Sequence, residues 1–215
     1  MNLTNLTDLA NLTNLAKPFT RRRTLQALFA ASTLPALSAF SGHAQSAANV
    51  VGLLREGGCV LMLRHAQTEA GIGDPPNFQL GICSTQRNLS DDGRAQSTRI
   101  RQWFATHKLA ASSVQSSAWC RCKDTATLAF GGYKLLPALN STFDTRNNET
   151  AQTEALRERL KSIRKGQFEV WVTHQVNISS MTGKGAAMGE AFVVNLATTG
   201  SAGFPGQVLA STDFS

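Results

Sequence analysis

Residues 59–69 read CVLMLRHAQTE, and this stretch constrains the fold of the chain more than any other. It begins with an apolar run of the length and composition of a buried strand, and the run ends abruptly at Arg64 and His65. Arginine is almost never fully buried unless it is paired. A buried strand that ends at this pair is therefore expected to deliver both side chains to a pocket.

Strands and helices alternate along the rest of the chain. Apolar runs predict strands at 59–63, 112–117 and 168–173. A glycine-rich connection follows the last of these, and after it come two weaker edge strands at 191–196 and 207–209. Helices are predicted at 47–56, after the N-cap Ser90, at 119–130 before Gly131, and at 151–163. This alternation predicts an α/β sheet that is covered by helices on both faces.

Three predicted strand ends carry polar residues that packing does not explain: Arg64 with His65, the segment 116–121 with Arg121, and His174. In an open α/β sheet the ligand site lies outside the carboxyl ends of the strands, so these side chains are expected to converge on an anion site. The set suits phosphoryl transfer, in which a neutral imidazole attacks phosphorus while planar guanidinium groups bind the phosphate oxygens. The alternative for each residue is a structural role, as a core histidine or a surface charge.

The net charge of +7 does not point to nucleic acid. The first 44 residues supply +3 of it, and the remaining +4 is only mildly basic. Outside these residues the sequence has no Lys/Arg-rich run with interleaved aromatics. We therefore expect small anionic substrates and no nucleic-acid partner.

Residues 1–44 are interpreted as an N-terminal extension with an export signal, and residues 45–215 as one globular domain. The leader has basic residues at 20–23, a mostly apolar run at 25–40, and small residues before Gln45. The segment TRRRTL at 20–25 resembles a twin-arginine signal, and a Sec signal is the alternative. A membrane span needs about 20 mainly apolar residues, and the run at 25–40 is shorter than that. We therefore expect a periplasmic or secreted protein without stable membrane insertion after signal cleavage, with an uncleaved anchor as the alternative.

Four motifs, in the same order, resemble those of the histidine phosphatase superfamily, also called the phosphoglycerate mutase-like fold. LRHAQTE at 63–69 is similar to its opening Arg-His-Gly motif, and LSDDGRAQ at 89–96 to its Leu-Thr-x-x-Gly-x-x-Gln helix start. SSAWCRCKDTA at 116–126 is similar to its Ser-Ser-x-x-x-Arg-x-x-x-Thr-Ala segment, and VTH at 172–174 to its final strand and histidine. The resemblance implies a three-layer α/β/α sandwich with a mixed central sheet.

The resemblance also implies the roles of the site residues. His65 would be the phosphorylated nucleophile, and Arg64, Arg121 and His174 would form the phosphate pocket. Arg87 is a further candidate for substrate binding, with a helix-flanking ion pair as its alternative. No metal and no organic cofactor is implied. The chain departs from the family pattern after the nucleophile, where alanine replaces the usual glycine at position 66.

A second departure concerns the general acid that protonates the leaving oxygen. Many family members supply this acid from a loop that follows the second arginine. Asp144 is the closest residue in spacing here, Glu149 is second, and Asp74 in the earlier loop is third. In phytase-like members the acid directly follows the second histidine, but this chain has Gln175 there.

The four cysteines fit an oxidising compartment, because an exported chain can form disulfides. Cys59 lies in the predicted apolar strand and is interpreted as a buried free thiol. The other three lie in segments that border the proposed site, and Cys83 is expected to pair with Cys120 or Cys122. A zinc site is the alternative, but Cys-x-Cys without a second pair is poor metal spacing.

The resemblance favours a phosphatase over a phosphomutase, because a mutase needs large insertions that keep water from its intermediate. RHA at 64–66, CSTQRNL at 83–89 and THQVNI at 173–178 look like a bacterial branch that includes phosphatases of lipopolysaccharide core sugars. We therefore expect a phosphomonoesterase that acts on a phosphorylated small molecule or glycan of the cell envelope. A catalytically weak phosphate- or phosphoprotein-binding module is the alternative, and the sequence leaves the oligomeric state open.

Overall fold

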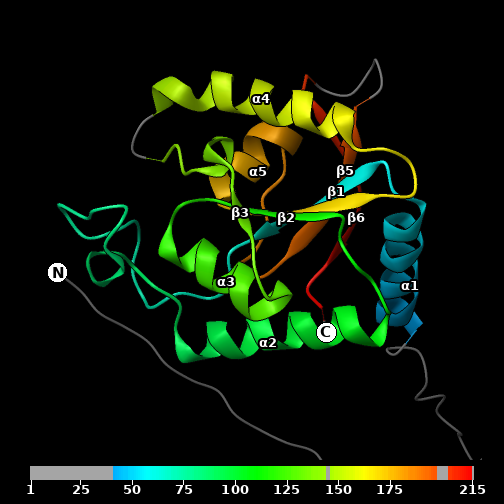
Figure 1. Ribbon diagram of the computed structural model, residues 1–215, viewed down its shortest axis with the longest axis horizontal. Helices are drawn as coiled ribbons and strands as arrows, with labels where there is room; N and C mark the ends of the chain where they lie inside the picture. The colour runs from blue at the N-terminus through cyan, green and yellow to red at the C-terminus, as the bar shows by residue number, and fades with distance from the viewer. Residues whose placement is uncertain (1–40, 144–145, 198–202, 215) are drawn as a thin grey trace, which may run out of the picture. The chain divides into compact units, whose positions relative to one another are not determined.

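The computed structural model describes residues 41–143, 146–197 and 203–214. Its helices are α1 (Ser41–Glu56), α2 (Asp91–Thr106), α3 (Cys120–Phe130), α4 (Glu149–Ser162) and α5 (Gln175–Thr182), with the short 3-10 helices η1 (Cys83–Thr85), η2 (Pro137–Leu139) and η3 (Arg146–Asn148) (Figure 1). Its strands are β1 (Cys59–Arg64), β2 (Ser113–Ser116), β3 (Lys134–Leu135), β4 (Phe168–Thr173), β5 (Ala191–Leu196) and β6 (Gly206–Thr212).

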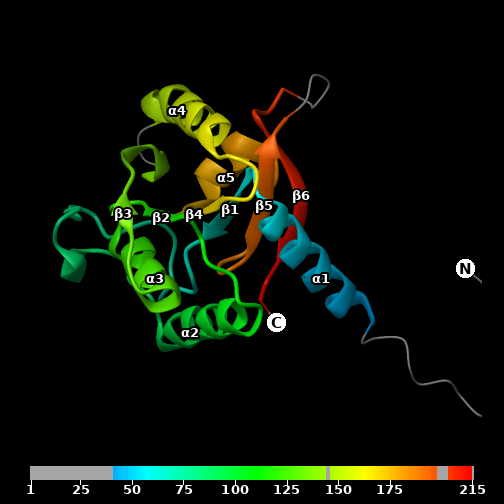
Figure 2. The same ribbon diagram turned by 45° about the vertical axis from the view of Figure 1, so that its right-hand side comes forward.

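The strands form one mixed sheet in the order β3-β2-β4-β1-β5-β6 (Figure 2). The first four strands in this order are parallel, whereas β5 is antiparallel to both of its neighbours. Arg64 at the end of β1 is paired with Thr173 at the end of β4. The residues that follow these two strands, His65 and His174, are therefore neighbours at the carboxyl edge of the parallel strands.

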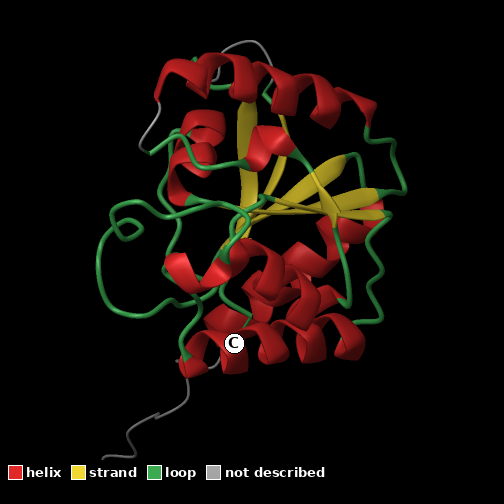
Figure 3. Cartoon of the chain, turned by 60° about the vertical axis from the view of Figure 1, so that its left-hand side comes forward, coloured by secondary structure: helices red, strands yellow, loops and turns green. Residues whose placement is uncertain are grey.

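Helices cover both faces of the sheet, as Figure 3 shows. Alternate side chains of β1 enter two different cores, because successive residues of a strand point to opposite faces. Leu61 and Leu63 pack in the core under α1, α2 and α3, whereas Val60 and Met62 pack in the core under α4 and α5. A strand covered on both faces must be apolar throughout, which explains the run CVLML. The predicted three-layer α/β/α fold with a mixed sheet is confirmed.

Local signals set the ends of the helices next to the site. The Ser90 side chain accepts a hydrogen bond from the Gly93 amide (3.2 Å) and so caps α2, as its position predicts. Gly131 ends α3 in the left-handed conformation, with a φ of 82°, which costs glycine little. Both helix boundaries agree with the sequence-based expectation.

Two expectations about the second half of the chain are wrong. β5 is not an edge strand but lies between β1 and β6, and its sequence AFVVNL is apolar because both of its faces are covered. The stretch expected to be a glycine-rich connection contains α5. Its sequence QVNISSMT is too short to show a helical period, but Ile178 and Met181 are fully buried in the core beside α4.

The predicted leader lies mostly outside the described residues. The structure gives no description of residues 1–40, so the extension, the export signal and the domain boundary at residue 45 stay predictions. Among the helices that are described, none is both long enough and apolar enough to cross a membrane.

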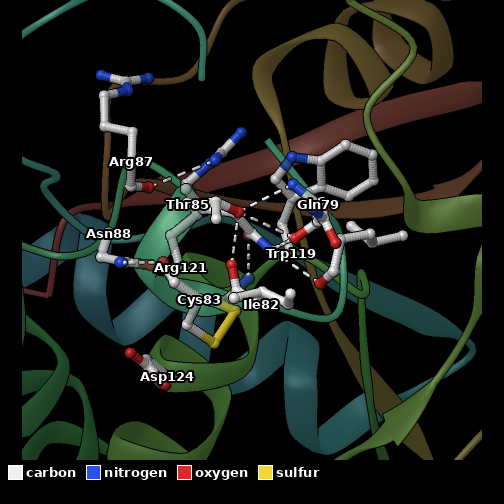
Figure 4. Close-up of a disulfide and its surroundings, with 12 residues drawn as sticks. Gln79, Ile82, Cys83, Thr85, Arg87, Asn88, Trp119, Arg121 and Asp124 are labelled. Atoms are coloured by element: carbon white, nitrogen blue, oxygen red, sulfur yellow. Dashed lines mark hydrogen bonds between the residues drawn. A yellow bond between two sulfur atoms is a disulfide. The ribbon is translucent and has the colours of Figure 1, made fainter. Parts of the chain in front are cut away.

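A disulfide joins Cys83 in η1 to Cys120 at the start of α3, which decides between the two expected pairings. The bond ties the loop 71–88 to the residue that precedes Arg121 in the chain. Figure 4 shows Arg121 and Trp119 on the same side of this crosslink. Cys59 and Cys122 are buried free thiols, and for Cys59 this was expected.

Replacing Cys83 with serine is expected to lower the free energy of unfolding by about 3 kcal/mol, because the crosslink restricts the unfolded chain. The two cysteines are separated by 37 residues in sequence, so the loop that the bond closes is long. Urea unfolding of the wild-type and Cys83→Ser proteins measures the difference. Reduction with dithiothreitol should remove the same stability from the wild type and none from the variant. A wild type that is equally stable after reduction would contradict this prediction.

Candidate active site

The two predicted catalytic histidines lie next to each other at the end of the sheet. The His65 amide donates a hydrogen bond to the Thr173 carbonyl (3.0 Å), which continues the pairing of β1 with β4. The ring centroids of His65 and His174 are 5.5 Å apart, in an edge-to-face arrangement. Both side chains are buried, with exposed fractions of 3% and 4%, and both line the same cavity.

The surroundings of His65 favour a nucleophilic imidazole. Its Nδ1 lies 2.9 Å from the Ala66 carbonyl oxygen. A carbonyl can only accept, so Nδ1 carries the proton and Nε2 keeps its lone pair. Burial, assisted by the nearby positive charge of Arg121, lowers the pKa of His65 to about 3 despite the bond to Ala66. The ring is therefore neutral at physiological pH, as nucleophilic attack requires.

A hydrogen-bond chain orients His174. Its Nε2 lies 2.8 Å from the Ser117 hydroxyl oxygen, which is 3.3 Å from Oδ1 of Asn140. The same Oδ1 also accepts from the Ala118 amide, so the Ser117 hydroxyl donates to Asn140 and accepts from His174. This arrangement places the proton of His174 on Nε2. Burial lowers the pKa of His174 well below its ordinary value, so this ring is also neutral.

Three guanidinium groups lie around the histidines. Arg64 donates to the Ala186 carbonyl (2.8 Å) and Arg87 to the Gly71 carbonyl (2.7 Å). Within the described part of the chain, the Nε atoms of Arg64, Arg87 and Arg121 are all buried without a hydrogen-bond partner. Burial, followed by the repulsion of the other two guanidinium groups, lowers the pKa of Arg64. Buried donors without partners are costly, so three of them beside one cavity indicate that it binds an anion.

Asp74 pairs with Arg121 in the wall of this cavity. Its carboxylate accepts two hydrogen bonds from the guanidinium group (2.7 and 3.1 Å) and one from the Trp119 indole (2.9 Å). Burial alone would raise the pKa of Asp74, but these bonds and one from the Arg87 amide outweigh it and lower the pKa. Asp74 is therefore ionised and is a poor proton donor. Because Asp74 occupies both terminal nitrogens of Arg121, the Nε is the nitrogen of this guanidinium that has no partner within the described residues.

The cavity has a volume of about 320 Å³, at the lower end of the range for small-molecule sites. Its lining comprises Arg64, His65, Gly71, Ile72, Gly73, Asp74, Arg87, Arg121, Ser141, Phe143, His174, Gln175, Val176 and Met188. Within the described residues, no group of three or more His, Cys, Asp or Glu side chains is placed to hold a metal ion.

Of the other two acid candidates, the structure describes only Glu149. Asp144 lies outside the described residues, directly after the lining residue Phe143. The Glu149 carboxylate accepts a hydrogen bond from the Ser180 hydroxyl (2.6 Å) and does not contribute to the cavity lining that the structure describes. Glu149, the first residue of α4, therefore bonds to α5 rather than facing the reaction centre.

Comparison with known protein families matches residues 60–177 to the histidine phosphatase superfamily (branch 1). The chain belongs to this superfamily. The enzyme class expected from the sequence, a histidine-type phosphatase, is confirmed by the match. Among curated proteins no match was found.

Solved structures that resemble this superfamily member include the protein histidine phosphatase SixA in complex with tungstate. SixA shares 14% identity with this chain and has a TM-score of 0.48. The match covers 72% of this chain and 96% of SixA. A mycobacterial glucosyl-3-phosphoglycerate phosphatase shares 16% identity with this chain and has a TM-score of 0.47. The match covers 64% of this chain and 90% of the phosphatase. The protein TTHB049 from Thermus thermophilus shares 19% identity with this chain and has a TM-score of 0.44. The match covers 70% of this chain and 97% of TTHB049.

The structure explains why the motif at 89–96 accompanies the motif that carries His65. Gln67, two residues after His65, is held by the start of α2: its carbonyl accepts from the Ser90 amide (3.2 Å), and its amide donates to Oε1 of Gln96 (3.0 Å). A Cβ atom on Gly93 would lie 1.9 Å from the Gln67 carbonyl oxygen. Glycine at this position therefore allows α2 to approach the loop that carries His65.

Two further residues support the same loop. The Ala66 amide donates to the Thr125 hydroxyl (3.0 Å), which in turn donates to the Arg121 carbonyl (2.7 Å), so Thr125 links the loop after His65 to the first turn of α3. Ala66 is fully buried and has no positive φ, so its methyl group causes no backbone strain where the superfamily pattern has glycine. The contact between Ala66 and Thr125 was not predicted, because it depends on packing between segments that are far apart in the sequence.

The low pKa of His65 predicts that the phosphatase loses stability as the pH falls. The folded chain leaves this ring neutral down to about pH 3, whereas the unfolded chain protonates it below its ordinary pKa of 6.5. The unfolded state therefore binds more protons, and lowering the pH from 7 to 5 should cost about 2 kcal/mol at this residue. Urea unfolding in phosphate-free buffer at both pH values tests this, with the non-titrating variant His65→Asn as the comparison. Equal losses in both proteins would contradict the prediction.

Proposed function

We propose that this protein hydrolyses phosphomonoesters through a phosphohistidine intermediate on His65. Nε2 of His65 attacks phosphorus, the bond from phosphorus to the alcohol oxygen breaks, and a general acid protonates the departing alcohol. Water then attacks the phosphohistidine and releases inorganic phosphate. Arg64, Arg87 and Arg121 match the negative charge on the phosphoryl oxygens during both steps.

One observation carries this proposal. The neutral ring of His65 lies in a cavity beside three buried guanidinium Nε donors that have no hydrogen-bond partner in the part of the chain that the structure describes. A dianionic phosphate satisfies such donors and matches their charge, and the lone pair on Nε2 faces no competing proton at neutral pH. A purely structural cluster of arginines would pair each donor with protein groups.

Trapping of the intermediate tests the proposal. The wild type should turn over p-nitrophenyl phosphate and become labelled by a radioactive phosphomonoester, and the label should be stable to base and lost in acid. Arg121→Lys keeps the charge but loses the planar guanidinium, so it should bind phosphate more weakly without changing the chemical nature of the label. Labelled protein whose phosphate survives acid would contradict a phosphohistidine.

Asp144 is proposed as the general acid, because the preceding residue, Phe143, lines the cavity. Asp74 is paired with Arg121, and Glu149 accepts from Ser180. The variant Asp144→Asn should therefore lower kcat by about 10²-fold or more for poor leaving groups, and Glu149→Gln should have little effect. A rate loss only in Glu149→Gln would assign the acid to that residue.

The substrate is proposed to be a phosphorylated small molecule or sugar of the bacterial envelope, reached through export to the periplasm or beyond. The leader at 1–44, the resemblance to the branch with lipopolysaccharide core phosphatases, and the Cys83–Cys120 disulfide support this location. Fractionation of bacteria that express the full chain tests it. Activity confined to the cytoplasm, with the full leader retained, would contradict export.

One observation favours a second candidate, a phosphate- or phosphoprotein-binding module with weak catalysis. Asp74 is the only carboxylate among the described residues that line the cavity, and it is paired with Arg121. If wild type and His65→Ala both bind phosphate but neither turns over monoesters, the binding module is correct.

A further inference from the structure

The mouth of the phosphate cavity is apolar, in contrast to its cationic floor. Ile72 and Phe143 line the cavity, yet their exposed fractions are 92% and 53%. Val176 and Met188 add further apolar surface to the same wall. Single exposed hydrophobic residues are common on protein surfaces, but here they lie together at the entrance of one cavity.

Several segments contribute to this apolar rim, which we define as Ile72, Phe143, Val176 and Met188. Val176 is in α5, and Met188 is in the loop before β5. Ile72 comes from the loop that the disulfide ties to α3, and Phe143 follows η2. The two segments meet at the cavity, because a Cβ atom on Gly73 would lie 3.9 Å from Cε1 of Phe143. The rim therefore spans the entrance rather than belonging to one loop.

Among the described lining residues, few polar groups are free to bind the part of a substrate that passes the rim. Apart from the two histidines, the uncharged polar side chains among the described lining residues are Ser141 and Gln175. Ser141 accepts from the Phe143 amide, while Gln175 accepts from the Ala186 amide and donates to Ser179. A polyhydroxyl group at this position would lose hydrogen bonds to water without full replacement, whereas an apolar group would gain from burial.

We propose that the enzyme selects phosphomonoesters whose alcohol is apolar, an alkyl or aryl group that contacts the rim while the phosphate binds the arginine floor. This inference rests on the proposed phosphatase function and narrows its substrate class. Among envelope phosphates it favours amphiphilic, lipid-like monoesters over bare sugar phosphates. Ile72 and Phe143 are the specificity-determining residues.

A homologous series of n-alkyl phosphates, from ethyl to octyl, tests the selection on the full chain. The value of kcat/KM should rise about two- to fourfold for each of the first added methylenes, because each one removes apolar surface from water. Octyl phosphate should exceed glycerol phosphate by at least about tenfold. Equal values for glycerol phosphate and octyl phosphate would overturn the proposal.

Variants assign the effect to the rim. Ile72→Ser and Phe143→Ser should lower kcat/KM about tenfold more for octyl phosphate than for ethyl phosphate. Leu135→Ser is the matched control, because Leu135 is 56% exposed on β3 and is not among the residues that line the cavity in the described structure. Equal losses for ethyl and octyl phosphate in the rim variants would overturn the assignment.

Binding of alkylphosphonates separates a failure of this inference from a failure of the proposed function. Calorimetry with His65→Ala should give at least about tenfold tighter binding of octylphosphonate than of ethylphosphonate, and Ile72→Ser should remove the difference. Tight octylphosphonate binding without any monoester turnover would sink the phosphatase function and keep the apolar selectivity. Equal binding of both phosphonates, with normal monoester turnover, would overturn the apolar selectivity and keep the phosphatase function.

Discussion

Replacing His65 with alanine is expected to lower kcat by about 10⁴-fold or more, because the covalent route requires its Nε2. Phosphate binding should change much less. Arg64, Arg87, Arg121 and His174 remain around the cavity after the substitution, and alanine leaves room for the ligand. Steady-state hydrolysis of p-nitrophenyl phosphate and calorimetry with inorganic phosphate measure the two effects separately.

His107→Ala is the matched control. This histidine ends α2, where its Nδ1 lies 2.8 Å from the Trp103 carbonyl oxygen, and it is not among the described residues that line the cavity. Its replacement should leave kcat within about twofold of the wild type. A His65→Ala protein that retains a tenth of the wild-type rate would show that another group attacks phosphorus.

Replacing Gly93 with alanine is expected to disturb both the fold and the reaction. The new Cβ would meet the carbonyl oxygen, the carbonyl carbon and the amide nitrogen of Gln67 at 1.9, 2.8 and 3.1 Å. These are backbone atoms, so no side-chain rotation relieves the clash, and either α2 or the loop after His65 must shift. We expect a loss of about 3 kcal/mol in the free energy of unfolding. A displacement of the nucleophile by about 1 Å would also cost about 10²-fold in kcat/KM.

Gly52→Ala provides the comparison, because both glycines lie in helices. Gly52 is in the middle of α1, and no other group lies within 4 Å of the position that its new methyl group would take. Alanine is favoured over glycine inside helices by about 1 kcal/mol, so this variant should be as stable as the wild type or more stable. Urea unfolding and kcat/KM of both variants test the contrast. A Gly93→Ala protein with wild-type stability and rate would refute the close contact of α2 with Gln67.

Much of the fold and the centre of the site could be predicted because their signals are local. The run CVLML and the strand before His174 are apolar throughout, which indicates burial on both faces. Because parallel strands end at the same edge of a sheet, the sequence also brings His65 and His174 together. Ser90 and Gly131 marked helix ends through capping chemistry that depends only on neighbouring residues.

The remaining features depend on contacts between segments that are far apart in sequence. Asp74 lies in a loop without periodicity, and nothing near it in the chain indicates that it pairs with Arg121, 47 residues later. α5 was missed because its few apolar residues show no period, and its burial under α4 stabilises it instead. β5 was taken for an edge strand because strand order follows from packing in space and not from order in the chain.

Sheet register sets the distance between His65 and His174. Adjacent strands lie about 4.8 Å apart, and the pairing of β1 with β4 places the two rings with their centroids 5.5 Å from each other. The segments that carry Ile72 and Phe143 lie outside this pairing, so they can change in length or sequence without altering the spacing of the histidines. The sheet is thus a scaffold on which new substrate preferences can be selected by substitutions in these loops, while the spacing of the two histidines is inherited intact.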